Sequence, residues 1–577
     1  MTDIGSGTTS KRAGRSPAYV YSVLSAALVV LIAVLTITAA QTAPPAIAEL
    51  APAAIEQIKD APPGQTSTAG EGEGGAGIGD PASRPTTTLP AAGPGATLPP
   101  EVRKVPRTRK CITSPGSAPR QTEDPQSPPC VPLWEGTDNG GATTKGVTRD
   151  EIVIAVPGGA SFSENDRTLE AYFNKRYEFY GRKLRLVPSD HPPAFTTGDK
   201  MQGAAVKVDE EVKAFASLSI GFQQGQEGVY YDALARRGII SVAGSFTGPS
   251  SAFESDYARN APYGWNYGVP LDLIEKSMAE VICNQLVGRS AKFAGGSEAL
   301  KKRRFGLIID AAVKGAPPVT GEPLLSISKR CGAEWDPTYN IVGDPTAAGD
   351  RTNKTKDAVT RMQGNGVTTI VCLCYSEYVR GAMDNSYLSS PPYQPEWFLS
   401  PYGDQDTDKT VRNFPTPQND HIISLRMWNK PLPRAQSAHW IAKREVNPTA
   451  PPDIQNFDTG YWNLLVLASG IQLAGPNLTP QTFEQGLQRA RFPNPGCGGP
   501  PEYQACVGFE GGTHTMIKDL ALTYFDPSGK SLEYDYTLDK NAFIQAKGQG
   551  AYCFAGQGTR YRLGTWPKGE PLSSPCK

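Results

Sequence analysis

Three physically different segments follow one another along this chain, and their order limits what it can fold into. A short basic head, residues 1–16, precedes an uncharged apolar run over 17–41. A stretch rich in Pro, Ala, Gly and Thr then covers 42–145. Such a composition buries too little apolar surface to fold, so it predicts a flexible linker. Regular patterns of apolar residues begin only at Gly146, which predicts that the folded part starts there.

The apolar run Tyr19–Ala40 has two interpretations. It reaches the length of about 20 residues that a membrane-spanning helix needs, whereas the apolar part of a signal peptide has about 7–15 residues. Basic residues precede the run, which predicts that the head stays in the cytoplasm and the rest is exported. The tripeptide Ala46-Ile47-Ala48, with a small residue at each end, offers a late cleavage site. We therefore expect a single-pass membrane protein with its C-terminal domain outside, or a secreted protein if the segment is cleaved.

The charges balance, because Lys and Arg together number 57 and Asp and Glu together also number 57. No strong electrostatic field favours binding to nucleic acid. The chain has 10 cysteines, an even number that suggests disulfides in an exported protein. Proximity and the predicted elements suggest the pairs Cys111–Cys130, Cys283–Cys331, Cys497–Cys506 and Cys553–Cys576.

Cys372 and Cys374 lie within the apolar run VTTIVCLCY. In a strand, residues two apart share one face. The simplest interpretation is two small buried residues, and their pairing stays open. A metal site is a weak alternative, since no second pair of cysteines or nearby histidine supports it.

Short apolar runs alternate with amphipathic stretches from Gly146 onward, which predicts β-α units and parallel sheets with helices on both faces. The pattern stops at ARNAPYGWNYGVP (258–270) and then restarts, which suggests two similar lobes. The predicted strands cover 151–156, 183–190, 213–220, 239–244, 304–310, 333–342, 367–375, 396–400 and 421–428, and the predicted helices cover 167–180, 200–211, 229–238, 271–287, 321–330 and 354–364.

Four phrases in this order resemble one protein family. They are GGATTKGVTRDEIVIAV (140–156), FDTGYWNLLVLASGIQLAGPNLTPQTFEQGL (457–487), MIKDLALTYFDPSGK (516–530) and YRLGTWP (561–567). They resemble the type I periplasmic substrate-binding proteins of the branched-chain amino acid ABC transport class, which are leucine-binding-protein-like, and especially their large actinobacterial relatives. The resemblance implies an α/β fold of two lobes joined by three crossings, with a cleft that closes on a small molecule. Lobe 1 is then expected over 146–265 and 426–515, and lobe 2 over 266–425 and 516–577.

Ligands of open α/β sheets bind beyond the carboxyl ends of the strands, so the candidate residues follow the predicted strands. The resemblance places Ser245 at a hydroxyl that contacts the ligand's carboxylate and Glu377 at an acid that meets its ammonium group. The loop 221–224 lacks the expected Ser or Thr, which weakens the case for an α-amino acid itself and leaves a small polar or amphipathic ligand, amino-acid-like or related. The candidate ligand-binding residues are Ser161, Phe162, Gln223, Ser245, Thr247, Tyr375, Glu377, Tyr402 and Asp458.

Each candidate also has a structural interpretation. The hydroxyl residues and Asp458 could cap helices, and the tyrosines could be packing residues. Trp265 and Tyr267 lie in a predicted crossing, and we expect them to pack the hinge rather than bind ligand.

An enzyme is not favoured. None of the four histidines forms an HExxH motif, and the folded part has no GxSxG or GxxxxGK[ST] motif. The triplet Asp404, Asp406 and Asp408 resembles the start of a calcium loop, but Lys409 stands where that loop needs Gly. We predict no catalytic residue, no metal and no cofactor.

The sequence therefore favours a solute-binding protein whose partners are a small-molecule ligand and an ABC importer permease, with a membrane contact through the N-terminal segment. The alternative is a membrane-anchored sensory or scaffold protein of the same fold without a role in transport.

The first prediction concerns the anchor. If Tyr19–Ala40 stays attached, mass spectrometry of the protein from its native cells should recover peptides from the basic head. A mature N-terminus near Glu49 would show instead that the segment is a cleaved signal.

Overall fold

The computed structural model describes residues 111–112, 120–121, 127–158, 164–190, 192, 197–219, 227–243, 253–310, 319–341, 348–431, 437–449, 457–489, 505, 507–531, 550–571 and 576. All of them belong to the compact unit Thr66–Lys577, and the other unit, Met1–Gln65, lies outside the described residues. The predicted head and apolar run therefore stay predictions. Within the described part of the chain, no helix is long and apolar enough to cross a membrane.

The end of the predicted linker differs from expectation, because residues from 127 onward contact the folded part. Asn139 is buried, and its side-chain amide donates hydrogen bonds to the carbonyls of Arg149 (2.7 Å) and Tyr180 (2.9 Å). Arg182 is also buried and donates to the carbonyls of Asn139 and Gly141. Turn residues rich in Gly and Asn thus bind the domain through backbone hydrogen bonds, which composition alone does not reveal. Farther upstream, two short strands, β1 (Cys111–Ile112) and β2 (Arg120–Gln121), pair antiparallel.

Five parallel strands form the first sheet, in the order β4-β3-β5-β6-β7. In β3 (Glu151–Pro157), Ile152 and Ile154 belong to one apolar core and Val153 and Ala155 to another. Successive side chains of a strand point to opposite faces, so a strand buried on both faces is apolar throughout. The strands are β3 (Glu151–Pro157), β4 (Lys183–Ser189), β5 (Ala216–Ser217), β6 (Ile240–Ala243) and β7 (Gly264–Asn266).

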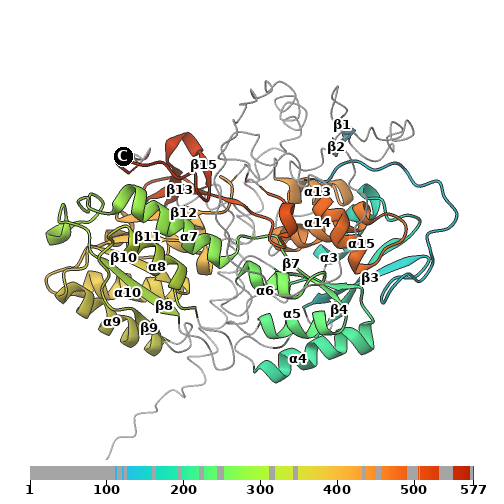
Figure 1. Cartoon of the computed structure of the whole chain (residues 1–577), viewed down its shortest axis with the longest axis horizontal. Helices are drawn as coiled ribbons and strands as arrows, with labels where there is room; N and C mark the ends of the chain where they lie inside the picture. The colour runs from blue at the N-terminus through green and yellow to red at the C-terminus, as the bar shows by residue number, and fades with distance from the viewer. Residues whose placement is uncertain are drawn as a thin grey trace, which may run out of the picture. The chain divides into compact units, whose positions relative to one another are not determined.

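Helices from two distant parts of the sequence cover this sheet. The helices that follow its strands are α3 (Glu164–Arg176), α4 (Gly198–Lys207) with the π-helical turn η2 (Val208–Val212), α5 (Glu227–Arg236) and α6 (Glu254–Arg259). Three later helices, α13 (Ala438–Val446), α14 (Phe457–Ala474) and α15 (Pro480–Arg489), join them. Helix α14 contacts α3 and β6, and Figure 1 shows these orange helices beside the blue-green α3. The chain therefore returns to the first sheet after building the second.

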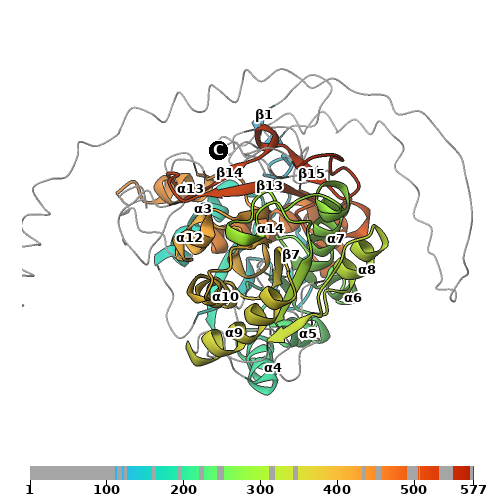
Figure 2. The same cartoon turned by 90° about the vertical axis from the view of Figure 1, so that its left-hand side faces the viewer.

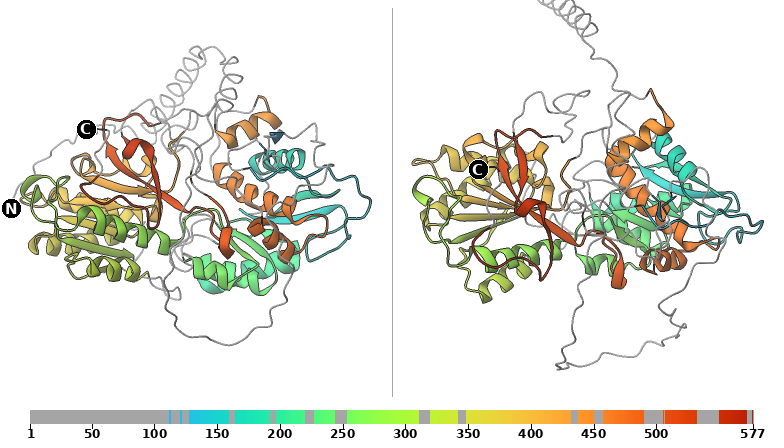
Figure 3. Two further views of the ribbon diagram at one scale, coloured as in Figure 1. Left: turned by 45° about the horizontal axis from the view of Figure 1, so that its top comes forward. Right: turned by 90° about the horizontal axis from the view of Figure 1, so that it is seen from above.

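The second sheet has the order β14-β13-β12-β11-β10-β8-β9, with β15 also paired to β13. Strands β8 to β12 are parallel, whereas β13 runs antiparallel to β12, β14 and β15. Figures 2 and 3 show these late strands in red at one edge of the sheet. The bounds are β8 (Phe305–Asp310), β9 (Tyr339–Ile341), β10 (Thr369–Leu373), β11 (Glu396–Leu399), β12 (Ile422–Arg426), β13 (Asp519–Asp526), β14 (Ala551–Phe554) and β15 (Arg560–Arg562).

One of the helices that accompany this sheet, α10, follows β10 and was not predicted. Its buried residues Tyr378, Val379, Ala382, Met383 and Ser386 have helical spacing. The helices are α7 (Leu271–Val281) with the π-helical turn η4 (Ile282–Leu286), α8 (Glu322–Arg330), α9 (Ala348–Gly364), α10 (Ser376–Leu388), α11 (Asp408–Val411) and α12 (Thr416–Asn419). Short 3-10 turns are η5 (Gly296–Glu298), η6 (Tyr402–Asp404), η9 (Glu510–Gly512) and η11 (Gly556–Gly558).

The apolar interior falls into three clusters. One lies between the first sheet and α4 and α5, and a second lies between the second sheet and α9 and α10. The third and largest includes residues of both sheets, for example Ile154 and Trp265 of the first and Leu425 of the second, together with Met427 after β12. The predicted α/β fold of two parallel sheets flanked by helices is therefore confirmed, and one core runs through both.

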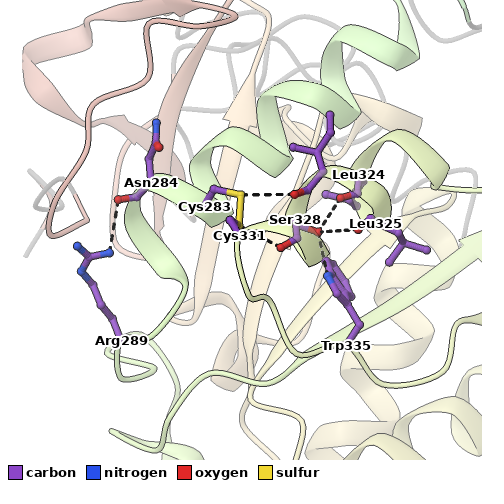
Figure 4. The surroundings of a disulfide bond; sticks show 9 residues. Cys283, Asn284, Arg289, Leu324, Leu325, Ser328, Cys331 and Trp335 are labelled. Atoms are coloured by element: carbon purple, nitrogen blue, oxygen red, sulfur yellow. Dashed lines mark hydrogen bonds between the residues drawn. A yellow bond between two sulfur atoms is a disulfide. The ribbon is translucent and has the colours of Figure 1, made fainter.

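Disulfides lie around the second sheet. The structure joins Cys283 to Cys331 with an S–S distance of 2.05 Å, and it also pairs Cys553 with Cys576 and Cys372 with Cys374. Figure 4 shows the Cys283–Cys331 bridge at the end of α8, where Trp335 donates from its indole N–H to the Ser328 hydroxyl (2.9 Å). Cys372 and Cys374 are both buried in the same cluster, as expected for one face of a strand. Cys130 is disulfide-bonded, while the side chains of Cys111, Cys497 and Cys506 lie outside the described residues.

The second prediction concerns the Cys283–Cys331 bridge, which closes a loop with a sequence separation of 48. The double variant Cys283→Ser/Cys331→Ser should lower the free energy of unfolding by about 3–4 kcal/mol, because the bridge restricts the unfolded chain. Urea denaturation measures the loss, with Cys553→Ser/Cys576→Ser as the comparison for a shorter loop. Free thiols at Cys283 and Cys331 in non-reducing peptide maps of the wild type would contradict the pairing.

Candidate functional site

The order of the strands indicates where a ligand would bind. If the parallel strands of each sheet are numbered along the chain, both sheets have the order 2-1-3-4-5. In such sheets ligands bind outside the carboxyl ends of the strands, at the point where the order reverses. That point lies between β3 and β5 in the first sheet and between β8 and β10 in the second.

Three chain crossings join the two sheets. The first, 267–270, leaves the carboxyl end of β7, and the second leaves the carboxyl end of β12, its described part being 427–431. The third, 513–518, leads into β13. Since two crossings start at carboxyl ends, both sheets turn their ligand-binding edge toward the crossings.

The candidate residues of the first sheet cannot be placed. Asp458 lies in the first turn of α14, but its side chain is not described. The loops after β3, β5 and β6 lie outside the described residues, and with them Ser161, Phe162, Gln223, Ser245 and Thr247.

The candidates of the second sheet lie close together. Tyr375 follows β10, Tyr402 follows β11, and their ring centroids are 5.9 Å apart with both side chains buried. Glu377 is half-buried in the first turn of α10, where its carboxylate accepts a hydrogen bond from the Ser376 hydroxyl (3.2 Å). Two tyrosines and an acid thus form a wall at the carboxyl ends of β10 and β11, and β10 borders the order reversal of the second sheet.

Gly403 allows the loop after β11 to approach this wall. Its φ is +61°, and a Cβ at this position would lie 2.9 Å from Tyr375 Cα and 3.1 Å from the Cys374 carbonyl oxygen. Neither backbone can move aside easily, so only glycine fits. Gln405, two residues later, donates from its side-chain amide to the carbonyls of Cys372 and Cys374. The loop is therefore held directly against the end of β10.

The acidic triplet in this loop has a structural role at two of its three positions. Asp408 is buried and pairs with Arg426 (3.0 Å), and it also accepts hydrogen bonds from the Ser531 hydroxyl (2.6 Å) and the Tyr552 N–H (3.0 Å). Asp406 is buried and accepts a hydrogen bond from the Met427 N–H (2.9 Å). Burial raises the pKa of Asp406 to about 6, against the opposing attraction of Arg426. Both carboxylates are thus engaged with the protein.

The first and third crossings run side by side. The Asn266 N–H donates to the His514 carbonyl (2.9 Å), the Met516 N–H to the Asn266 carbonyl (2.9 Å), and the Ile517 N–H to the Gly268 carbonyl (3.1 Å). Trp265, at the start of this ladder, is fully buried and packs against Phe509 and His514. Trp265 therefore packs beside the crossings, as expected.

Arg560 joins the second crossing to the third. Its guanidinium donates to the carbonyls of Met427 (2.7 Å) and Trp428 (3.2 Å) and pairs with the carboxylate of Asp519 (2.9 Å). The side chains of Arg560 and Asp519 are only 2% and 4% exposed. Because the guanidinium presents several donors in a fixed plane, one side chain can hold three backbone or carboxylate positions.

A hollow lies where the crossings meet, and we call it the crossing hollow. About 300 Å³ of space, including its mouth open to solvent, lies within it. Tyr267 and Trp428 face one another with ring centroids 6.3 Å apart. The lining consists of Tyr267, Met427, Trp428, Asn429, Trp462, Ala505, Val507, Met516 and Ile517.

The sequence reasoning missed the hollow and most of its lining. Tyr267 was expected to pack the hinge, and it does line the crossings. Trp428 and Trp462 stand in the segments HIISLRMW and FDTGYWNLL, where a tryptophan at a strand end or in the first turns of a helix was the only available signal.

Among groups of three possible metal ligands in the described part of the chain, one combines Asp526, Cys553 and Cys576. The two sulfur atoms are bonded to each other, so neither is a thiolate ligand.

Of the comparisons with known proteins, only the one with solved structures found similar proteins. No protein-family description matches the chain, and no curated protein sequence matches it. A solute-binding protein of an ABC transporter from Rhodopseudomonas palustris HaA2, in complex with p-hydroxybenzoic acid, is 11% identical with a TM-score of 0.46, over 72% of this chain and 98% of that one. A substrate-binding protein from Desulfitobacterium hafniense in complex with Leu is 12% identical with a TM-score of 0.43, over 70% and 99%. A branched-chain amino acid ABC transporter protein from Thermus thermophilus with bound valine is 13% identical with a TM-score of 0.45, over 65% and 92%.

The third prediction uses the buried carboxyl group of Asp406. Its pKa of about 6 in the folded protein exceeds the ordinary value of 3.8, so the folded state holds this proton more tightly than the unfolded state. The stabilisation is complete below pH about 4 and is lost as the pH rises to about 6, by about 3 kcal/mol. Relative to wild type, Asp406→Asn should therefore gain stability over this window.

Urea denaturation between pH 4 and pH 7 tests this, with the exposed Asp357→Asn as the control for losing a surface charge. Arg426, Asp404 and Asp408 are the charged groups near Asp406. A stability difference between Asp406→Asn and wild type that stays constant with pH would contradict the prediction.

Proposed function

We propose that this protein is an extracytoplasmic solute-binding protein that captures a small polar or amphipathic ligand between two lobes and supplies it to an ABC importer. The observation that most supports this is the repeated strand order, 2-1-3-4-5, in two sheets joined by three crossings at the carboxyl ends of their strands. A chain built this way has two binding edges that face one hinge, so rotation about the crossings can close the edges on a ligand.

The wall of Tyr375, Glu377 and Tyr402 supplies the contacts from the second lobe. The buried tyrosines pack at the back of this wall, and the half-buried carboxylate of Glu377 can accept hydrogen bonds from an ammonium or hydroxyl group. From the first lobe we propose the loops that contain Ser161, Ser245 and Thr247, with Phe162 and Gln223 beside them, and Asp458 at the start of α14. Binding requires no catalytic group, and we propose none.

A second role is favoured by the length of Tyr19–Ala40. An uncleaved anchor would hold the domain at the membrane surface, which suits a sensor or scaffold whose lobes respond to a ligand without feeding a transporter. Both roles place the domain outside the cytoplasm and need the same ligand.

The fourth prediction is that a ligand raises the thermal stability of the full-length protein and compacts it. The panel should include p-hydroxybenzoate, leucine and valine, which are bound in the similar structures. A ligand at 100 times its Kd adds about 2.7 kcal/mol to the free energy of unfolding. Small-angle scattering should show a smaller radius of gyration at the same concentration.

For the ligand so identified, Glu377→Gln should weaken binding about tenfold or more, since a hydrogen bond to a charged group is lost. Asp384→Asn, on the outer part of the same helix, should bind normally. Affinity unchanged in Glu377→Gln would exclude this wall from the site, and a scattering profile unmoved by saturating ligand would exclude closure.

A further inference from the structure

His514, in the third crossing, lies between two carboxylates that belong to the first lobe. Its Nε2 is 3.1 Å from Oε1 of Glu484 on α15, and its Nδ1 is 4.0 Å from Oε1 of Glu254 on α6. The imidazole is only 4% exposed and packs on the ring of Trp265, with the ring centroids 4.6 Å apart. A side chain that can carry a positive charge is thus enclosed by two acids and an aromatic ring at the hinge.

The donors and acceptors around the ring fit the imidazolium better than the neutral imidazole. A carboxylate only accepts, so Nε2 carries the hydrogen in its bond to Glu484. In a neutral ring Nδ1 is then a bare acceptor, and it is buried without a hydrogen-bond partner among the described residues. An added proton on Nδ1 replaces this unfavourable arrangement by an ion pair with Glu254.

Glu254 connects this ring to the other parts of the hinge. Its carboxylate also accepts hydrogen bonds from the N–H of His514 (2.6 Å) and the hydroxyl of Thr515 (2.5 Å). Its own N–H donates to the carboxylate of Asp272 (3.2 Å) on α7, a helix that accompanies the second sheet. A change of charge at His514 therefore acts at a point where the first lobe, the third crossing and the second lobe meet.

The charges around the ring lack one positive partner. Lys518, in the same crossing, donates to the hydroxyl of Thr513 (2.8 Å) and the carbonyl of Thr515 (2.5 Å), and Lys276 pairs with Asp272 (2.8 Å). Among the described side chains, three acids thus face two cations, and a protonated His514 supplies the third positive charge. The charged groups are Glu254 of α6, Glu484 of α15, Asp272 and Lys276 of α7, and Lys518 of the crossing.

We infer that His514 is a proton-dependent latch, which fastens the third crossing to the first lobe through Glu484 and Glu254 when its ring is protonated. Without the proton the tie to Glu254 is lost, and the crossing is held less firmly. The two carboxylates are each 24% exposed, which gives the buried ring a route to protons from solvent. The latch needs no ligand. Only its setting rests on the proposed function, since an extracytoplasmic hinge would respond to the pH outside the cell.

Hydrogen exchange of the full-length protein, followed by mass spectrometry, tests the latch without any ligand. The readout is the exchange of peptides that cover 264–270 and 513–518, which contain the hydrogen-bonded amides of Asn266, Met516 and Ile517. Rates of variant and wild type are compared at the same pH, so that the intrinsic pH dependence of exchange cancels.

His514→Gln keeps a neutral N–H donor for Glu484 but cannot take up a proton. Its crossing peptides should exchange at least about tenfold faster than wild type at about pH 5.5, because a hydrogen bond to a charged group is lost. At about pH 8 the two rates should agree within about twofold, because histidine ordinarily loses its charge between these conditions.

His439→Gln is the matched control, since it removes another half-buried histidine, on α13, and it should follow the wild type at both pH values. Glu484→Gln removes one carboxylate of the latch and should accelerate exchange more at about pH 5.5 than at about pH 8. If His514→Gln fails to fold, as judged by circular dichroism, Glu484→Gln decides alone.

The same variant-to-wild-type ratio at both pH values would overturn the inference. So would an acceleration spread over the whole protein, because it would show general destabilisation instead of a loosened hinge. Either result would leave the solute-binding proposal untouched, since no ligand enters the measurement. Likewise, a failure of every ligand in the panel to bind would reject that proposal and retain a latch that passes this test.

Discussion

The guanidinium of Arg560 makes the contacts that hold together the chain crossings between the two sheets. It holds the carbonyls of Met427 and Trp428 in the second crossing and the carboxylate of Asp519 at the end of the third. The third crossing is in turn hydrogen-bonded to the first along its backbone. All three connections therefore meet in one small region. Because both charges of the pair are buried, loss of either partner would leave an uncompensated charge, so the crossings cannot separate one at a time.

A second buried group extends this region into the candidate site. Asp406 accepts a hydrogen bond from the Met427 N–H. Asp408, two residues later, pairs with Arg426 and accepts hydrogen bonds from the Ser531 hydroxyl and the Tyr552 N–H. The loop that carries Tyr402 is thus fixed both to the second crossing and to the late antiparallel strands. A movement of the crossing must displace this loop, which connects the hinge to the wall formed by Tyr375 and Tyr402.

Periodicity predicted most of the parallel strands of both sheets, whereas β7 and the antiparallel strands β13, β14 and β15 were not predicted. Periodicity failed where contacts between residues distant in sequence determine the local structure. Only two residues separate β10 from α10, without the Gly or Pro that usually separates elements, so no helix was predicted between the strands 367–375 and 396–400. Of the predicted strand 213–220, only Ala216–Ser217 pairs as β5. The structural role of Asp406 and Asp408 was not predicted, because their partners, Met427 and Arg426, are distant in sequence. The candidate site was predicted in part, since Tyr375, Glu377 and Tyr402 are neighbours, but Trp428 and Trp462 meet only through the crossings.

The distribution of apolar residues decides how such a molecule can move. Separate cores bind α4 and α5 to the first sheet and α9 and α10 to the second, so each lobe has an interior of its own. The third core continues from one sheet to the other through Trp265, Tyr267 and Met427. Pulling the sheets apart would expose this dry surface to water, whereas rotation about it keeps the surface buried. A ligand therefore gains most binding free energy by contacting the rim of this shared core. The crossing hollow lies where residues of that core open toward solvent.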